Sequence, residues 1–330
     1  MDELINLYDN DMFSSFRGID LQDLIIYIQA FDLRYRDTLW LPRGVTFGPE
    51  IEFENLSNDV VNNYLITLSD SLFSVFDGTL SNGGEFNSFL MRDDVSHWII
   101  LKKICMFLKD KKADMSHNAG GHIHVGAHIL GSDCDAWLDF LKLYTAYESV
   151  LFRFFYGDKV SARKKILRFA PPIADDLYSI LDSIKDAKSI QDIFLNLPMD
   201  KYQALSFWHV NFAEPDEMKK GHTVEFRMPN GSAEEVVLQN YINVCTKMLL
   251  YASMHCLDTD FLNYKLGKER ISSSRDFCLY HEVLLKNSLE FVDILFNNNL
   301  DKIYFLKQYL KNFKSDYNSS RCLKKGRNTF

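Results

Sequence analysis

Apolar and polar residues alternate in some parts of the chain and recur at helical spacing in others. Alternation predicts strands at 46–54, 73–80, 84–88, 122–129, 202–212 and 223–228. Helical spacing predicts helices at 20–35, 58–72, 94–111, 132–155, 234–256, 282–296 and 301–313, with two short helices between Pro172 and Pro198. Several strands carry one polar face, which is typical of an antiparallel sheet packed on helices. The pattern therefore predicts an α+β fold.

Composition and charge narrow the class of protein. The 330 residues include 37 basic and 45 acidic side chains, so the formal net charge is −8. An acidic chain lacks the basic surface that nucleic-acid binding needs, and no apolar run approaches the length of a membrane span. The first residues do not resemble a signal peptide, and the 6 scattered cysteines form no CxxC pair. We therefore expect a cytoplasmic protein without a nucleic-acid or membrane partner.

The first predicted strand carries three glutamates on one side. Glu50, Glu52 and Glu54 alternate with apolar residues, so neighbouring carboxylates are about 6–7 Å apart. Such like charges repel unless a cation lies between them or one carboxylate is protonated. A solvated outer face is the plain alternative for this strand taken alone.

The strand predicted at 122–129 repeats this arrangement with imidazoles. His122, His124 and His128 share one face, and the pair Gly120–Gly121 precedes them. Two histidines at strand spacing can share a metal ion or a phosphate, although an isolated HxH pair is weak evidence. The glycines allow a ligand to approach the backbone closely.

Two further elements add charged side chains. Glu225 and Arg227 share a face of the strand at 223–228. They could simply form a surface ion pair, or the carboxylate could hold a cation while the guanidinium binds a phosphate. Asp77 and Glu85 lie on either side of a predicted turn and could meet. Sites rich in carboxylates select Mg²⁺ or Mn²⁺, and added histidines favour Mn²⁺.

Taken in order, these motifs resemble those of the amidoligase family, which is related to glutamine synthetase and glutamate–cysteine ligase. The signature strands are similar to Phe47-Gly-Pro-Glu-Ile-Glu-Phe, Gly121-His-Ile-His-Val and Thr223-Val-Glu-Phe-Arg-Met-Pro. The segment 77–88 is similar to the family's D-G-S…E…S stretch, with Thr79 in place of Ser. Lys201-Tyr-Gln-Ala-Leu205 resembles the (K/R)-Y-x-A-L-N element, with Ser206 in place of Asn. The resemblance covers about residues 44–255.

The resemblance implies a glutamine synthetase-like catalytic domain. Its curved antiparallel sheet would carry helices on one face, and a cleft on the other would hold ATP and two or three Mg²⁺ or Mn²⁺ ions. The implied metal ligands are Glu50, His122 and Glu225 at the nucleotide phosphates, and Glu52, Glu85 and Asp77 nearer the acceptor acid. His124 would contact phosphate, Arg227 would stabilise the transferred phosphoryl group, and Lys201 is a further candidate for phosphate binding. Glu54 has no counterpart in the family, and its position alone makes it our candidate for the catalytic base.

The implied activity is ATP-dependent ligation of a carboxylate to an amine through an acyl phosphate. The acceptor could be an amino acid, a peptide or a protein, and the oligomeric state stays open. Alternatives are a phosphotransferase similar to the phosphagen kinases, a non-catalytic binding relative and a zinc hydrolase. The excess of carboxylates fits a zinc hydrolase poorly. A non-catalytic relative is disfavoured because carboxylates that repel each other would not be expected together at a site without a function.

The predicted organisation has three parts. Residues 1–45 form a helical lead-in, 46–256 the catalytic domain and 257–330 a helical extension. We expect the last ~12 residues to be flexible, because free termini fray. The short stretch before the first motif also argues against the ring assembly of glutamine synthetases.

Overall fold

The computed structural model describes residues 21–115, 118–156, 166–269 and 282–311. They fall into two compact units. The smaller unit comprises 1–34, 149–161 and 274–330, and the larger unit comprises 35–148 and 162–273. The predicted domain boundaries near residues 45 and 256 stay predictions, and the predicted flexible tail lies outside the described residues.

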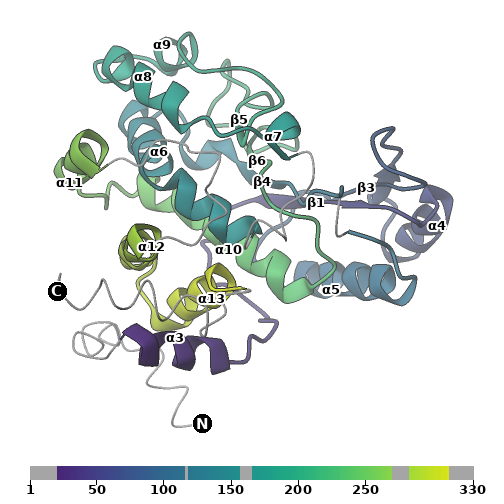
Figure 1. The fold of residues 1–330 in the computed structure, drawn as a ribbon. Coiled ribbons are helices and arrows are strands. Elements are labelled where there is room, and N and C mark those ends of the chain that lie inside the picture. Colours follow the sequence, from purple (N-terminus) through teal and green to yellow (C-terminus); the bar gives the residue numbers. More distant parts are fainter. Residues whose placement is uncertain (1–20, 116–117, 157–165, 270–281, 312–330) are drawn as a thin grey trace. The chain divides into compact units, whose positions relative to one another are not determined.

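The larger unit is built on a six-stranded sheet in the order β2-β3-β1-β4-β6-β5 (Figure 1). The strands are β1 (Phe47–Phe53), β2 (Phe73–Val75), β3 (Gly84–Asn87), β4 (Ile123–Gly126), β5 (Leu205–Ser206) and β6 (Thr223–Phe226). All neighbouring strands are antiparallel. The predicted combination of helices with an antiparallel sheet is therefore confirmed, whereas its curvature and cleft stay predictions.

One face of this sheet is apolar and packs on helices. Its fully buried side chains include Ile51, Phe53, Ile123, Val125 and Phe226. Helix α10 (Glu235–Ser253) packs against β1 and β4 on this face (Figure 1). Phe140 and Tyr144 of helix α6 (Cys134–Tyr156) lie against Phe226, with ring centroids 6.3 and 6.4 Å apart. Full burial of each such side chain contributes about 1.5–3 kcal/mol, so this face anchors the sheet.

The other helices of the larger unit are α4 (Asn58–Leu68), α5 (Val95–Asp110), α7 (Ile166–Phe169), α8 (Ala174–Ile184), α9 (Ile190–Phe194) and α11 (Thr259–Tyr264). Asp94 caps α5, because its carboxylate accepts a hydrogen bond from the Ser96 amide at 2.8 Å. The smaller unit contains α3 (Leu21–Ala30), α12 (Glu282–Leu295) and α13 (Asn299–Tyr309). Within the described ranges, no helix combines the length and apolar character needed to cross a bilayer.

Several predictions about local structure are wrong. The strand predicted at 73–80 ends at Val75, because the chain turns at Asp77, whose carbonyl accepts a hydrogen bond from Leu80 N. The helix predicted at 20–35 ends at Ala30. The strand predicted at 202–212 is reduced to Leu205–Ser206, because the chain turns at Phe207, whose carbonyl accepts a hydrogen bond from Val210 N. The strand predicted at 122–129 ends at Gly126, and Ala127–Ile129 form a 3₁₀ turn. Asp133, rather than Ser132, accepts hydrogen bonds from the first amides of α6, those of residues 135 and 136.

Candidate metal centre

The polar face of the sheet gathers the acidic and imidazole side chains that the sequence singles out. Glu52 lies opposite Glu85 across β1 and β3, and His124 lies opposite Glu225 across β4 and β6. Glu50 and His122 form the third pair, because the Glu50 backbone amide donates a hydrogen bond to the His122 carbonyl at 2.8 Å. Because side chains alternate along a strand, these six side chains share the face opposite to α10.

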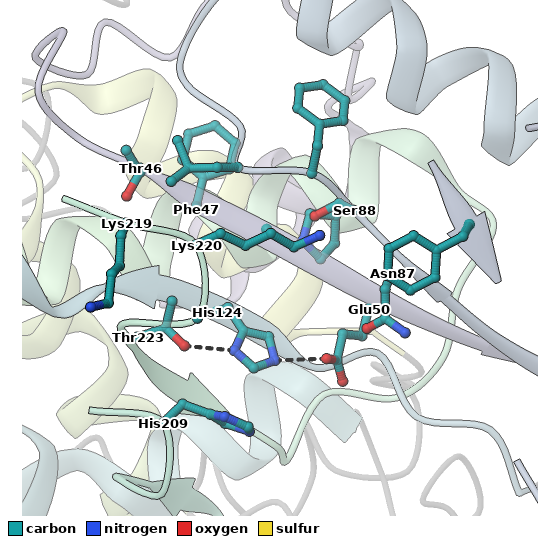
Figure 2. Close-up of a pocket in the computed structure, with 16 residues that line it drawn as sticks. Thr46, Phe47, Glu50, Asn87, Ser88, His124, His209, Lys219, Lys220 and Thr223 are labelled. Atoms are coloured by element: carbon teal, nitrogen blue, oxygen red, sulfur yellow. Dashed lines mark hydrogen bonds and ion pairs between the residues drawn. The ribbon is translucent and has the colours of Figure 1, made fainter. Parts of the chain in front are cut away.

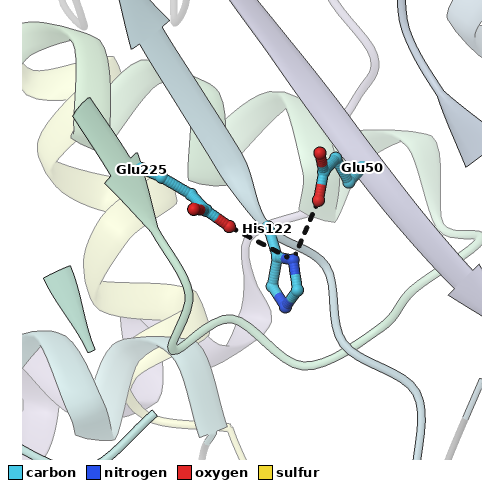
Figure 3. Close-up of side chains that lie close together, drawn as sticks. All are labelled: Glu50, His122 and Glu225. Atoms are coloured by element: carbon cyan, nitrogen blue, oxygen red, sulfur yellow. Dashed lines mark hydrogen bonds and ion pairs between the residues drawn. The ribbon is translucent and has the colours of Figure 1, made fainter. Parts of the chain in front are cut away.

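One cluster consists of Glu50 of β1, His122 directly before β4 and Glu225 of β6 (Figure 3). His122 Nδ1 lies 3.0 Å from Glu50 Oε2 and 3.5 Å from Glu225 Oε1. One potential ligand atom from each residue lies within 4.8 Å of the others. Only 1% of the Glu225 side chain is exposed, so this charged group is almost completely removed from water.

A second cluster shares His122 with the first and adds Glu52 and Glu85. His122 Nε2 lies 3.4 Å from Glu52 Oε1, and the Gly120 amide donates a hydrogen bond to the other Glu52 oxygen. The Asn87 amide donates to Glu85 Oε1 at 3.0 Å. The two clusters therefore lie side by side, with His122 between them.

These residues fit a divalent cation. Glu225 Oε2 is buried and accepts no hydrogen bond from any residue in the described part of the chain. A buried carboxylate oxygen that accepts no hydrogen bond costs free energy unless a cation satisfies it. Carboxylates with one imidazole suit Mn²⁺ or Mg²⁺. A neutral imidazole offers one lone pair, so His122 could ligate only one of two cations. If Nδ1 were the ligand, between Glu50 and Glu225, Nε2–H would be left to donate toward Glu52.

The close packing of these groups changes their protonation. Burial alone would raise the pKa of Glu50, but His124 and His122 outweigh it and hold that pKa well below its usual range. Burial alone would lower the pKa of His124, but Glu50 and Glu225 raise it to about 9. Burial and repulsion by Glu50 raise the pKa of Glu85 to about 7. At neutral pH, the metal-free site therefore holds a charged imidazole and a partly protonated carboxyl group.

The raised pKa of Glu85 predicts pH-dependent metal binding. We expect Mn²⁺ affinity to increase by up to about tenfold per pH unit below pH 7 and to level off above it, because Mn²⁺ must displace the proton from Glu85. Calorimetry in two buffers would count the protons that Mn²⁺ binding releases. Glu85→Gln should flatten this pH profile of Mn²⁺ affinity, and an unchanged profile in this variant would contradict the assignment. The same shift should lower the free energy of unfolding of the metal-free protein as the pH rises from 4.5 to about 7, because the folded state holds this proton more tightly than the unfolded chain.

Arg227 lies beside the first cluster. Its guanidinium forms an ion pair with Glu225, and only 8% of its side chain is exposed. The guanidinium carbon also lies 5.9 Å from the centre of the Tyr202 ring. Lys201 is exposed and lies over the same tyrosine at 6.0 Å, outside both clusters. Arg227 is therefore placed at the clusters, whereas the role of Lys201 in phosphate binding stays a prediction.

Glu54 and Asp77 hold loops and are in neither cluster. Glu54 is 6% exposed and accepts hydrogen bonds from the Ser81 amide at 2.7 Å and the Asn118 side chain at 2.9 Å. Asp77 accepts a hydrogen bond from the Thr79 amide at 2.7 Å, within its own turn. Their roles as base and as metal ligand stay predictions. His128 donates to or accepts from no cluster residue that the structure describes, and its Nε2 lies 2.9 Å from the Gly44 carbonyl.

Three residues near the clusters were not among the predicted site residues. The Thr223 hydroxyl lies 2.8 Å from His124 Nδ1, and His209 Nε2 lies 3.7 Å from Glu225 Oε2. Asn87, described above, is the third. Thr223 and Asn87 lie two residues from Glu225 and Glu85, so the strand alternation could have identified them. His209 gave no such signal, because it lies in a turn where a strand was predicted.

A pocket of about 350 Å³ adjoins the clusters at the N-terminal half of β1 (Figure 2). Glu50 and His124 line its inner side, with His124 Nε2 3.0 Å from Glu50 Oε1. Lys219 and Lys220 line another side, and Lys220 Nζ lies 4.9 Å from the centre of the Phe73 ring. The pocket therefore combines cationic side chains with an apolar wall.

The comparison with protein families agrees with the resemblance found in the sequence. Residues 89–249 match the model of a family described as "Putative amidoligase enzyme". The match includes β4, β5 and β6, whereas β1 and β3 precede it. A solved structure described as "Crystal structure of novel glutamine synthase homolog" is similar at a TM-score of 0.42 and 10% identity, over 92% of this chain and 74% of that chain. A search of the curated proteins finds no match.

Proposed function

We propose that the protein is an ATP-dependent carboxylate–amine ligase that works through an acyl phosphate. The observation that carries this proposal is the pair of carboxylate–imidazole clusters that share His122 on one face of the sheet. The match to the amidoligase family model supports a ligase-type function, because His122, His124, Glu225 and Arg227 all lie in the matched segment.

The pocket at β1 suits the nucleotide. His124, whose pKa is about 9, would be positively charged at neutral pH and could donate a hydrogen bond to phosphate oxygens. Lys220 adds a second positively charged side chain, and the Phe73 and Phe89 rings offer an apolar surface for the base of the nucleotide. In this arrangement the phosphates would point toward Glu50, which lines the pocket and belongs to the first cluster.

The first step transfers the terminal phosphoryl group. A carboxylate oxygen of the acceptor acid attacks the γ-phosphorus, the bond to the bridging oxygen breaks, and ADP leaves with that electron pair. Glu50, His122 and Glu225 would hold one cation, and Glu52 and Glu85 a second. When bound, such cations neutralise charge on phosphate oxygens. Arg227 would stabilise the charge on the phosphoryl group in transit.

The second step forms the amide. The amine nitrogen attacks the acyl carbon and loses a proton to a base, and the C–O bond breaks so that inorganic phosphate leaves. Glu54 stays our candidate for the base, although loop amides occupy both of its oxygens. Lys219 and Lys220 belong to a loop beside the pocket, whose closure would keep water from the acyl phosphate.

Hydroxylamine tests this proposal, because it traps an acyl phosphate as a hydroxamate. Incubation with ATP, Mg²⁺ or Mn²⁺, hydroxylamine and a library of acids should give hydroxamate and equal amounts of ADP and phosphate with a subset of acids. ADP with a stable phosphorylated acid or guanidine, and no hydroxamate, would instead support the phosphotransferase. Nucleotide binding without any turnover across the library would support a binding protein.

A further inference from the structure

A hydroxyl group holds one of the imidazoles in the pocket at β1. Thr223 is the first residue of β6 and lines this pocket together with His124. Its Oγ1 lies 2.8 Å from His124 Nδ1 (Figure 2). In the register of β4 and β6, Thr223 lies opposite Gly126, two residues after His124, so the hydroxyl reaches the ring diagonally across the two strands. The resemblance to the amidoligase family gave this threonine no role.

The other nitrogen of the same ring faces the proposed phosphate site. His124 Nε2 lies 3.0 Å from Glu50 Oε1, as Figure 2 shows. Glu50 lines the inner side of the pocket and belongs to the first cluster. Because the imidazole ring is rigid and planar, a hydrogen bond that fixes Nδ1 also fixes the direction of Nε2. Thr223 therefore determines where the second nitrogen of His124 points.

The two contacts of the ring also restrict where its proton lies. Glu50 Oε1 is an acceptor, so a lone pair on His124 Nε2 would face another lone pair at 3.0 Å. A proton on Nε2 avoids this repulsion. The Thr223 hydroxyl suits both remaining states of Nδ1, because it can accept from Nδ1–H of a charged ring and can donate to Nδ1 of a neutral ring. In both states Nε2–H is a donor, which is what a phosphate oxygen requires.

The sheet holds the hydroxyl in its place. Thr223 has a branched side chain, which restricts rotation about its first side-chain bond. Its backbone amide donates a hydrogen bond to the His209 carbonyl at 3.4 Å, and its other side is paired with β4. Among the residues that the structure describes, no other group forms a hydrogen bond with His124 Nδ1. The orientation of this ring therefore depends on Thr223.

We propose that Thr223 is the positioning residue for His124, and that its hydroxyl holds Nε2–H toward the phosphates of the bound nucleotide. Thr223 itself would not contact the reacting atoms. This inference rests on the proposed function, because that function places nucleotide phosphates beside Glu50. It gives a role in nucleotide binding to a residue outside both metal clusters.

Thr223→Val tests the inference, because valine keeps the branched shape and lacks the hydroxyl. We expect this variant to bind ATP with Mg²⁺ about tenfold more weakly than the wild type, since losing a group that orients a histidine costs 10- to 100-fold at metal sites. Adenosine, which has no phosphate, should bind both proteins equally. Thr223→Ser should bind ATP within about threefold of the wild type, because it restores the hydroxyl without the restricted rotation. Titration calorimetry measures each Kd.

A double-mutant cycle separates positioning of His124 from a general loss of structure. If Thr223 acts through His124, Thr223→Val should have no further effect on ATP binding in a His124→Gln background. An equal loss in that background would overturn the inference, as would equal losses for ATP and adenosine in Thr223→Val. Thr67→Val is the matched control, since Thr67 is exposed and does not line the pocket at β1.

The hydroxamate assay distinguishes this inference from the ligase function. If the wild type forms hydroxamate and Thr223→Val binds ATP as tightly as the wild type, the inference fails while the ligase function stands. If the wild type binds ATP but forms no hydroxamate, the ligase function fails, and the ATP titrations still decide the role of Thr223. If the wild type does not bind ATP, both fail.

Discussion

Arg227→Lys is expected to lower the rate of hydroxamate formation by about 10³-fold, because the substitution removes the guanidinium that we propose stabilises the phosphoryl group during its transfer. Lysine keeps the charge but not the planar fork that can bind two oxygens at once. Its single ammonium would have to serve both Glu225 and the phosphoryl group. The rate is measured at saturating ATP, metal and acid, so that the loss reports the reaction step rather than binding.

The lysine variant is preferred to alanine because Arg227 is buried. Arg227→Ala would remove the guanidinium from a buried ion pair with Glu225, and breaking such a pair costs about 3–5 kcal/mol of stability. Arg43→Lys is the matched control, since Arg43 is exposed and does not line the pocket at β1. Wild-type activity in Arg227→Lys, with an unchanged circular dichroism spectrum, would remove Arg227 from the mechanism.

Separate substitutions in the two clusters should weaken the binding of different cations. We expect the wild type to bind two Mn²⁺ ions. Glu225→Gln should weaken one of them by about 100-fold or more and Glu85→Gln the other, since loss even of a group that only orients a ligand costs 10- to 100-fold. His122→Ala should weaken the first ion most and the second through the lost contact to Glu52. Titration followed by electron paramagnetic resonance counts the ions directly.

Asp182→Asn is the control for these substitutions, because 97% of the Asp182 side chain is exposed. It should bind both ions with the affinity of the wild type. A single Mn²⁺ site that Glu225→Gln and Glu85→Gln weaken equally would show that the clusters form one centre. Unchanged binding in both variants would show that the carboxylates do not hold metal at all.

The polar face could be predicted from the sequence because strand alternation has a period of two. Once Ile51 and Phe53 are assigned to the core, Glu50 and Glu52 must lie on the opposite face. The same argument places His122 with His124, and Glu225 with Arg227. Alternation does not decide which strands are neighbours. The pairing of Glu52 with Glu85 therefore became certain only with the register of β1 and β3.

Residues in turns and loops could not be predicted in this way, because such segments have no periodic pattern. His128 continues the alternation of His122 and His124, but the strand ends at Gly126 and the chain turns away. His209 follows a strand of only two residues, so its position beside Glu225 depends on the turn that comes after it.

The hydrogen bond from Glu50 N to the His122 carbonyl bears on the size of the cation that the site would prefer. Because backbone hydrogen bonds join the three strand segments that carry Glu50, His122 and Glu225, the distances among their backbone positions are largely set before a cation arrives. A large ion such as Ca²⁺ takes six to eight oxygens at 2.3–2.6 Å, whereas Mg²⁺ requires a compact octahedron at 2.0–2.1 Å. We therefore expect a site with so few carboxylates on this sheet to bind Mg²⁺ in preference to Ca²⁺.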